Sequence, residues 1–293
     1  MIDLHLHSTF SDGSFTPEQL VAEAKKIGLS AIALTDHDNI GGVPSFLEAC
    51  ARYAIRGVPG VEISVDYPKG TMHILGYFID FKSPKLLQRV EELKAGRARR
   101  NTEILKKLNN LGMPLTMAEI SSFAGGDNVG RLHFAQALQA RGYVTSIQDA
   151  FERYLAKGKS GYAERKRFTA RHGIEMILQA DGVPALSHPF TLELAPKELE
   201  NLVKELAGTG LQGIEVYYPQ HNAGRTRQYL NLAKKFKLVA TGGTDFHGSP
   251  MPDLKIGRGF GSLSVPDSVM TELDARRCGK PEGGRQNAET TAT

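Results

Sequence analysis

Two short polar motifs near opposite ends of the chain constrain its fold most. Residues 3–7 alternate polar and apolar side chains, as in a half-buried strand, so His5 and His7 point to one face. Asp245 and His247 repeat this spacing at the end of the last predicted strand. Imidazole and carboxylate groups suit a borderline divalent metal. If both motifs serve one metal site, the first and last strands must be neighbours, as they are in a closed barrel.

Strands and helices alternate along most of the chain. Residues 31–34 form a continuous apolar run typical of a buried parallel strand, and residues 43–54 have helical periodicity. We predict further strands over 58–65, 72–80, 183–189, 213–218 and 238–247. This alternation predicts an α/β fold with a parallel sheet and right-handed crossovers, and the length of 293 residues fits one barrel with an insertion as well as two domains.

The alternation is interrupted between residues 85 and 168. The pattern here predicts one long helix from residue 84 to about 111, followed by shorter helices over 117–123, 132–140 and 147–155. We therefore predict an all-helical insertion at 85–168 that covers the active site of a discontinuous barrel domain, formed by residues 1–84 and 169–274. Beyond Asp274 the composition turns polar, which predicts a disordered tail over 275–293.

Positive charge is concentrated in the insertion. The chain has a formal net charge of +4, but between Lys85 and Arg171 there are 17 Lys and Arg against 8 Asp and Glu. A basic segment beside an acidic, histidine-rich one suggests an anionic substrate, although a solvated helical surface is the simpler explanation for most of these charges. We see no apolar membrane span and no N-terminal leader, and Cys50 and Cys278 lack metal-binding spacing. We therefore expect a cytoplasmic protein without a membrane partner.

The potential metal ligands fall at comparable places in the predicted barrel. At or just past the C-terminal ends of predicted strands lie His5, His7, His37, Glu62, His188, Asp245 and His247. In a parallel barrel that rim is where active sites form. Any single histidine could be a hydrogen-bonded core residue, but chance would not place the whole set on one rim. Asp12, in the turn at 11–13, offers another ligand, and His73 lies near the start of its strand.

The motifs that contain these residues resemble those of the PHP (polymerase and histidinol phosphatase) phosphoesterases. They are Asp-Leu-His-Leu-His-Ser at 3–8, Ser-Asp-Gly at 11–13, Leu-Thr-Asp-His-Asp at 34–38, Pro-Gly-Val-Glu-Ile-Ser at 59–64, His-Ile-Leu-Gly at 73–76, Ser-His-Pro at 187–189 and Gly-Thr-Asp-Phe-His at 243–247. They occur in order over nearly the whole chain. The resemblance implies a distorted (β/α)7 TIM-like barrel with up to three divalent metal ions at its C-terminal rim.

The resemblance also implies which residues hold each metal ion. The three sets are His5, His7, Glu62 and Asp245; Glu62, His73 and His188, with Glu62 bridging; and Asp12, His37 and His247. Asp12 stands where many relatives have histidine, which favours Mn²⁺ or Fe²⁺ over Zn²⁺ at the third site. Glu62, Asp245 and His188 are expected to be catalytic, with a metal-bridging hydroxide as the nucleophile. Asp36 and Asp38 either orient ligand histidines or cap the next helix.

Basic residues of the insertion are candidates for binding a second phosphate. Arg97 and Arg100 lie one helical turn apart, and Arg131 and His133 lie near the start of a predicted helix. Lys157 lies in a glycine-broken loop, and for each cation a solvated surface position is the alternative. The runs at 130–135 and 154–159 resemble a bacterial PHP subfamily with a helical insertion, although Leu132 replaces a common proline.

The subfamily resemblance implies a phosphoesterase that removes the 5′-phosphate of 3′,5′-nucleoside bisphosphates, and in some members trims 5′-phosphorylated RNA from its 5′ end. The metals would take the 5′-phosphate and the insertion the 3′-phosphate. One alternative is a phosphatase for another small ester, such as histidinol phosphate or a cyclic phosphodiester. A metal-stabilised binding module would lack ligands, and an RNA-binding protein would interleave aromatic and basic residues. We expect no duplex DNA partner.

Overall fold

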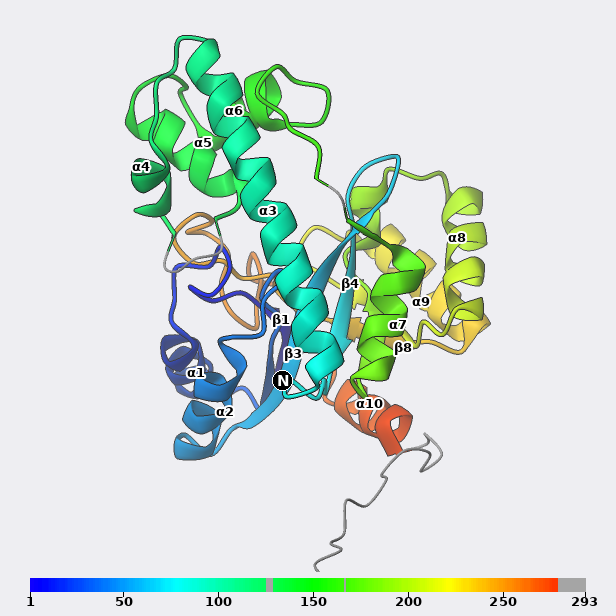
Figure 1. Ribbon diagram of the computed structural model, residues 1–293. Helices are drawn as coiled ribbons and strands as arrows, with labels where there is room; N and C mark the ends of the chain where they lie inside the picture. The colour runs from blue at the N-terminus through cyan, green and yellow to red at the C-terminus, as the bar shows by residue number, and fades with distance from the viewer. Residues whose placement is uncertain (125–128, 166, 279–293) are drawn as a thin grey trace, which may run out of the picture.

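A curved sheet lies at the centre of the protein, which is shown as a computed structural model in Figure 1. The structure describes residues 1–124, 129–165 and 167–278. The strand order is β1–β2–β3–β4–β6–β7–β8, and the short β5 pairs with β3. The strands are β1 (Ile2–Leu6), β2 (Ala31–Leu34), β3 (Arg56–Asp66), β4 (Met72–Tyr77), β5 (Phe168–Thr169), β6 (Val183–Leu186), β7 (Gly213–Tyr217) and β8 (Val239–Gly242).

Helices follow most of the strands and pack on the sheet. They are α1 (Pro17–Lys26), α2 (Val43–Arg52), α7 (Ala170–Gln179), α8 (Pro196–Gly208), α9 (Ala223–Phe236), α10 (Ser268–Cys278) and the 3₁₀-helix η2 (Pro189–Leu192). The start of α1 shows how the sequence sets these bounds: Thr16 and Gln19 form a capping box around Pro17. No helix of the described residues is both long and apolar enough to cross a membrane.

The two faces of the sheet are buried in separate hydrophobic clusters. Along β2, Ala31 and Ala33 belong to a cluster that includes residues of α10, whereas Ile32 and Leu34 belong to the cluster under α1 and α2. Helix α10 includes residues 275–278, so the predicted disordered tail begins too early. Residues 279–293 lie outside the described residues.

The sheet curves so that its two edge strands, β1 and β8, come together at the rim. The backbone N–H of His7 donates to the carbonyl of Phe246 (3.0 Å), and the N–H of Asp245 donates to the carbonyl of His5 (2.9 Å). The first and last strands are therefore neighbours, as the two polar motifs predict. The α/β barrel-like fold with a helical insertion is confirmed.

Strand β4 differs from the predicted parallel sheet. It runs antiparallel to both β3 and β6. The five residues between β3 and β4 are too few for a parallel crossover, which needs about a dozen, so the two strands form a hairpin. This reversal brings His73, near the start of β4, to the same rim as the ends of the parallel strands.

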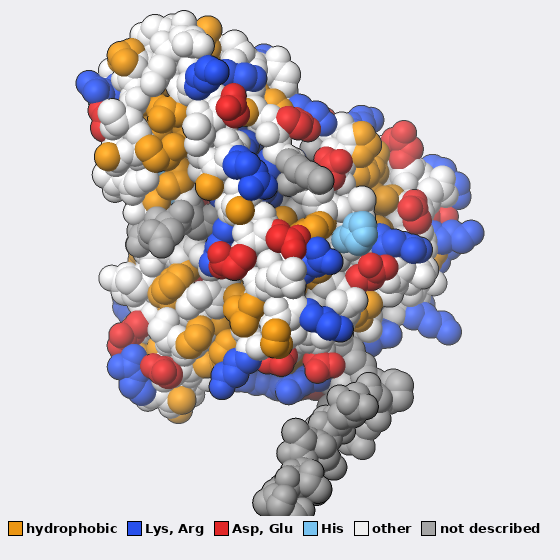
Figure 2. Space-filling model, viewed as in Figure 1, with side chains coloured by type: hydrophobic (Ala, Val, Ile, Leu, Met, Phe, Trp, Pro, Cys, Tyr) orange, Lys and Arg blue, Asp and Glu red, His pale blue; other side chains and the backbone are white. Residues whose placement is uncertain are grey.

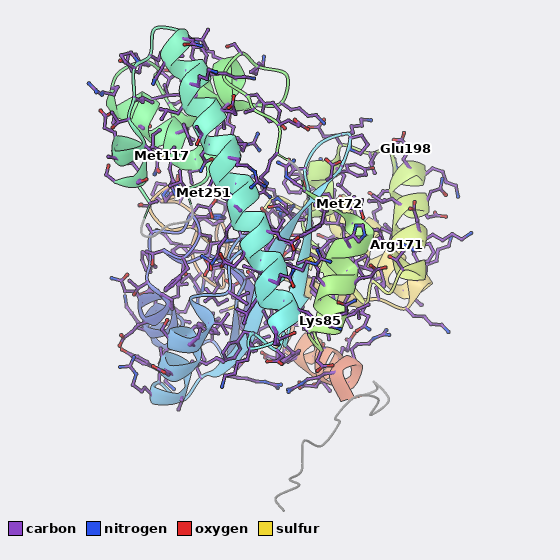
Figure 3. All side chains as sticks on the ribbon, in the orientation of Figure 1. Met72, Lys85, Met117, Arg171, Glu198 and Met251 are labelled. Atoms are coloured by element: carbon purple, nitrogen blue, oxygen red, sulfur yellow. The ribbon has the colours of Figure 1, made fainter. Side chains whose placement is uncertain are left out.

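The insertion is built on one long helix. Its elements are α3 (Pro84–Asn110), α4 (Met117–Ser121), α5 (Arg131–Ala140), α6 (Ile147–Ala150) and the π-helix η1 (Phe151–Leu155). Figure 3 shows α3 running from Lys85 beside the barrel to the part that contains Met117. Leu93 of α3 packs in the barrel's core cluster, whereas Ile104 packs in the insertion's own cluster. The two cores thus separate between residues 93 and 104, after the predicted boundary at residue 85.

Candidate metal centre and phosphate cavity

Four buried atoms from three parts of the chain converge at the rim. The Asp245 Oδ1 atom lies 3.2 Å from His5 Nε2 and 2.9 Å from His7 Nε2, and Glu62 Oε2 lies 3.4 Å from both nitrogens. None of these four atoms has a hydrogen-bond partner of acceptable geometry among the described residues. Because buried polar atoms are normally hydrogen-bonded, this convergence fits a bound cation.

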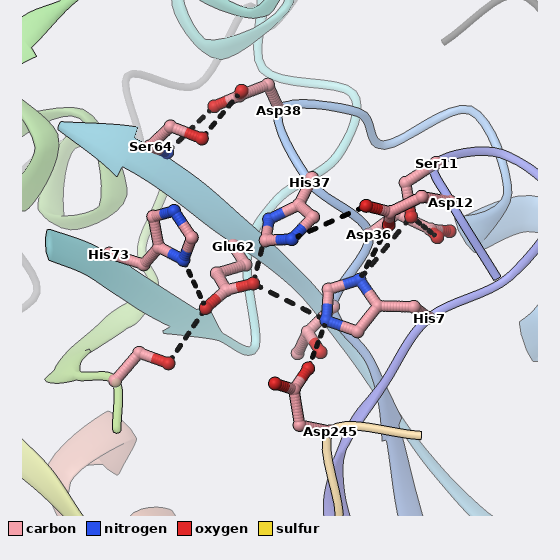
Figure 4. Close-up of polar contacts among 12 residues, drawn as sticks. His7, Ser11, Asp12, Asp36, His37, Asp38, Glu62, Ser64, His73 and Asp245 are labelled. Atoms are coloured by element: carbon pink, nitrogen blue, oxygen red, sulfur yellow. Dashed lines mark hydrogen bonds and ion pairs between the residues drawn. The ribbon is translucent and has the colours of Figure 1, made fainter. Parts of the chain in front are cut away.

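Glu62 occupies the middle of the cluster (Figure 4). Its Oε1 lies 3.1 Å from His73 Nδ1 and 3.0 Å from His188 Nε2, and its Oε2 lies 2.8 Å from His37 Nδ1. The hydroxyl of Ser187 donates to Oε1 (2.8 Å). Glu62 therefore contacts the second predicted ligand set and also His37, which the resemblance grouped with Asp12. The Glu62 side chain is fully buried.

A third group surrounds Asp12 and is looser than the first. His247 Nε2 lies 3.3 Å from Asp12 Oδ1, and His37 Nε2 lies 3.9 Å from Oδ2. His7 Nδ1 is 3.9 Å from Asp12, and the His7 ring stacks on that of His247 at 4.2 Å. His7 thus presents one nitrogen to the first group and the other to the third.

The carboxylates of this cluster and two of its imidazoles have the protonation states of metal ligands. For the other four imidazoles, His5, His37, His188 and His247, burial lowers the pKa but the neighbouring carboxylates raise it further, so that it lies above its usual value. Burial raises the pKa values of Asp12, Glu62 and Asp245, but the neighbouring imidazoles lower them further, so that each lies well below its usual range. Burial lowers the pKa of His7 to about 3 and that of His73 to about 4. These carboxylates are therefore ionised and these two imidazoles neutral near pH 7, which are the forms that bind metal ions.

The resemblance did not include Glu215 and Tyr218, which support the ligands. Glu215 Oε1 lies 2.9 Å from His5 Nδ1, and Glu215 Oε2 accepts the backbone N–H of His188 (2.7 Å). Tyr218 donates its hydroxyl proton to Asp245 Oδ2 (2.8 Å). Such partners fix the orientation of a ligand side chain. The available signal for Glu215 was a carboxylate inside an otherwise apolar strand, β7.

Asp36 and Asp38 accept hydrogen bonds from neighbouring loops and strands, and neither caps a helix of the described residues. Asp36 accepts hydrogen bonds from the Ser8 N–H and hydroxyl, each 2.7 Å, and from the Ser11 hydroxyl at 2.5 Å, which fixes the loop that leads to Asp12. Asp38 accepts bonds from Ser64 and from arginines of the insertion and of the segment that leaves it. The capping alternative is wrong, because α2 follows Gly42 at its N-cap, without a side-chain capping bond.

A cavity of about 590 Å³ opens beside the ligand cluster. Three predicted ligands line it: Asp12, His37 and His73. Its cationic lining consists of Arg97, Arg100, Arg131, Lys157, Arg165 and Arg167. The first four were predicted from sequence to bind substrate. Arg165 and Arg167 were missed, because the irregular segment that carries them between the insertion and β5 gave no periodic signal.

The cations of the cavity differ in how they are balanced. Asp38 pairs with Arg97 (2.5 Å) and with Arg165 (2.9 Å). Arg100 is only 5% exposed, and its Nε and Nη2 have no hydrogen-bond partner among the described residues. Burial and the neighbouring arginines lower the pKa of Arg100 well below its usual value. Arg131 donates to the Leu155 carbonyl at 3.2 Å. The cavity thus has positive charge that no described carboxylate pairs with.

The exposed cations of the insertion behave as a solvated surface. Four carboxylates of the insertion pair with Lys or Arg side chains at the surface: Glu91 with Lys94, Glu92 with Arg89, Glu119 with Arg141 and Asp149 with Arg153. Figure 2 likewise shows basic and acidic side chains interspersed over the visible face. These four surface cations are therefore balanced by carboxylates, unlike Arg100 and Arg131 of the cavity.

His133 does not line the arginine cavity. Its Nδ1 accepts the backbone N–H of Gly130 (3.0 Å) and so caps the start of α5. The imidazole is buried and lines a separate, smaller cavity of about 180 Å³, which it shares with Asp12. This geometry gives His133 a helix-capping role and does not bring it to the cationic lining.

Comparison with known proteins agrees with this geometry. A family model described as the PHP domain matches residues 3–243, so the chain belongs to the PHP family. It is 34% identical to the 5′-3′ exoribonuclease Rnm of Salmonella typhimurium, over 87% of this chain and 88% of that protein. It is 31% identical to the 3′,5′-nucleoside bisphosphate phosphatase of Chromobacterium violaceum, over 94% of this chain and 97% of that protein.

A solved structure has the same fold. It is described as an amidohydrolase from Chromobacterium violaceum with bound sulfate and no metal. It superposes with a TM-score of 0.84 at 30% identity, and covers 94% of this chain and 96% of its own.

Proposed function

We propose that this PHP-family chain is a metal-dependent phosphoesterase that acts on 3′,5′-nucleoside bisphosphates and on the 5′ ends of short 5′-phosphorylated RNA. The observation that carries this proposal is that the ligand cluster and the arginine cavity share one space, because His37 and His73 line the cavity together with Arg100. A substrate with one phosphate at the cluster therefore has cations within reach for a second. The two relatives named above act on substrates of this kind.

The residues present fit three divalent metal ions. The first would be held by His5, His7, Glu62 and Asp245, the second by Glu62, His73 and His188, and the third by Asp12, His37 and His247. Mn²⁺ suits the oxygen-containing third group, and Fe²⁺ and Zn²⁺ are the alternatives. When bound, such ions lower the pKa of water and neutralise charge on phosphoryl oxygens. In this proposal Glu62, Asp245 and His188 are the catalytic residues.

The arginine cavity supplies the second anchor. Asp38 already balances Arg97 and Arg165, so the arginines left to meet an anion are Arg100, Arg131 and Arg167. A buried guanidinium without a partner is costly, and a phosphate would satisfy it with charge-assisted hydrogen bonds. The second phosphate therefore completes the cavity, much as metal ions complete the cluster.

The reactions of the two relatives indicate which of the two phosphates is hydrolysed. A 5′-3′ exoribonuclease releases the terminal nucleotide by breaking the phosphodiester on its 3′ side. If one site performs both reactions, the 5′-phosphate lies in the arginine cavity and the 3′-phosphate at the metals. The sequence resemblance had suggested the opposite orientation, with the metals on the 5′-phosphate. We favour the 3′ side, and the products distinguish the two orientations.

The test is incubation of the Mn²⁺-loaded protein with adenosine 3′,5′-bisphosphate, with separation of the products by chromatography. Release of phosphate together with 5′-AMP supports the proposed orientation, whereas 3′-AMP supports the opposite one. Parallel assays use 5′-AMP and histidinol phosphate, and a chelated sample serves as the control. Faster hydrolysis of either monophosphate would contradict the role of the arginine cavity. Activity that survives chelation would contradict metal dependence.

A further inference from the structure

A cluster of aromatic side chains adjoins the metal ligands but does not line the arginine cavity. Phe190 lies in η2, which begins directly after the predicted ligand His188. Tyr218 lies just past the end of β7. Their ring centroids are 5.5 Å apart, and His221 lies 5.5 Å from Phe190 and 5.1 Å from Tyr218. All three aromatic side chains are half-buried, so part of each reaches the surface.

The cluster adjoins the metal ligands but not the arginine cavity. The Tyr218 ring lies 5.7 Å from that of His188, and its hydroxyl bonds to Asp245. Neither Phe190 nor Tyr218 lines the arginine cavity. In the view of Figure 4, Asp245 lies on the opposite side of Glu62 from Asp38, the partner of the cavity's arginines. A substrate anchored in the cavity would therefore cross the metal ligands and continue toward the aromatic cluster.

A cation accompanies these rings. The guanidinium of Arg225, in the first turn of α9, lies 5.5 Å from the centroid of Phe190. Arg225 is exposed, and no carboxylate of the described residues lies within ion-pair distance of it. Aromatic faces beside an arginine are the means by which proteins hold single-stranded nucleic acid: bases stack on the rings and the cation attracts the backbone.

We propose that Phe190, with Tyr218 and Arg225 beside it, is the platform that holds the nucleotide following the hydrolysed phosphate. The base of that nucleotide stacks on Phe190, and the phosphate beyond it meets Arg225. This inference rests on the proposed function and deepens it, because it explains how one site serves both substrate sizes. A nucleoside bisphosphate ends at the metals and leaves the platform empty, whereas RNA uses it.

The experiment compares kcat/KM for a 5′-phosphorylated diadenylate and for adenosine 3′,5′-bisphosphate in the Mn²⁺-loaded protein. Phe190→Ala should lower the value for the dinucleotide by about tenfold, as expected for the loss of one base stack, and leave the bisphosphate value unchanged. Phe190→Leu keeps apolar bulk without an aromatic face, so it should fold and show most of the same loss. Arg225→Gln should matter only for a trinucleotide or longer, which has the additional phosphate.

Phe168→Ala is the matched control. Phe168 is also half-buried and carries an arginine, Arg89, 5.5 Å from its ring, but it does not adjoin the metal ligands. This control should not change the ratio between the two substrates. Equal losses on both substrates in Phe190→Leu, or none on either, would overturn the platform. A wild-type protein that cleaves the bisphosphate but not the dinucleotide would also overturn it, while the proposed phosphatase would stand. Cleavage of neither would refute the proposed function itself, and the platform with it.

Discussion

The ligand cluster and the arginine cavity are both buried and highly charged, but their charges are balanced in opposite ways. In the cluster, the carboxylates of Asp12, Glu62 and Asp245 lie among imidazoles that hold them ionised. In the cavity, five arginines have one described carboxylate within ion-pair distance, that of Asp38. The cluster therefore has carboxylates and imidazoles that suit cations, and the cavity has arginines that suit an anion. In the proposed function, each half of the site therefore binds one of the two phosphates of the substrate.

The largest expected effect is on the cluster side of this comparison. Glu62→Gln removes the carboxylate that contacts His37, His73 and His188. It also replaces one carboxylate oxygen by an amide NH₂ group, which donates hydrogen bonds and cannot bind a metal ion. Turnover of adenosine 3′,5′-bisphosphate should fall by about 10³-fold, and bound metal should fall in parallel, as measured by elemental analysis. Glu48→Gln, an exposed change on α2, should alter neither quantity. Wild-type turnover in Glu62→Gln would remove its proposed role.

Asp38→Asn tests the one balanced part of the cavity. The change leaves Arg97 and Arg165 buried without a carboxylate, which should lower the free energy of unfolding by about 3–5 kcal/mol. Urea unfolding measures this loss. Asp66→Asn, an exposed change at the end of β3, serves as the control and should have little effect. A stability equal to wild type would show that the arginines are balanced by other groups.

The stabilisation that Asp38 provides should also depend on pH. Burial raises the pKa of Asp38, but Arg165 and Arg97 lower it further, so that it lies below its ordinary value of 3.8. The stabilisation from Asp38 is therefore present above a pH of about 4 and is lost as the pH falls below it. The stability difference between wild type and Asp38→Asn should be constant from pH 7 to 5 and shrink in stronger acid. A difference that grows in acid would contradict this assignment.

Arg100→Met tests the unbalanced part of the cavity. Loss of a charge-assisted contact should cost about 1.5–3 kcal/mol in kcat/KM for the bisphosphate, and Arg131→Ala should cost a similar amount. Removal of the buried charge of Arg100 should leave the free energy of unfolding unchanged or increase it. Arg99→Met, at the exposed neighbouring position, is the control. Strong destabilisation by Arg100→Met would mean that this guanidinium already has an internal partner.

The smallest effect is expected at Lys157. Its Nζ donates to the Pro68 carbonyl (2.9 Å), which links the insertion to the β3–β4 hairpin across the cavity. Because the side chain is exposed, Lys157→Ala should raise KM for the bisphosphate by only a few-fold, equivalent to less than about 1 kcal/mol. Steady-state kinetics at two salt concentrations would check this. A loss as large as that of Arg100→Met would place Lys157 in direct contact with the second phosphate.

The sequence predicts the cluster better than the cavity for a physical reason. Alternation at period two and buried apolar strands place His5, His7 and Asp245 at strand ends, and a barrel brings strand ends together. The reversed direction of β4 was not predicted, because the apolar run of residues 72–80 does not show which way a strand runs. His73 was nevertheless grouped with the other ligands, through its motif rather than through the strand pattern.

The cavity depends on contacts that no local pattern reports. Arg165 reaches Asp38 across 127 positions of sequence, and nothing around either residue indicates that pairing. Helical spacing did predict Arg97 and Arg100 on one face of α3, but not that Asp38 would balance only the first. His133 was predicted to bind substrate from its neighbours in sequence, whereas its imidazole caps its own helix.

The closure of the rim has a consequence for synthesis of the protein. Asp3 accepts hydrogen bonds from the hydroxyl and the backbone N–H of Thr244, 241 positions later, and Asp245 completes the group that His5 and His7 begin. At 5–20 residues per second, a ribosome needs roughly 10–50 s to reach that point. Until then the emerging chain lacks Asp245 and His247, two of the nine predicted ligands, and β1 is paired on one edge only, with β2. The centre is therefore completed late in translation, and a product interrupted before residue 245 has no complete centre.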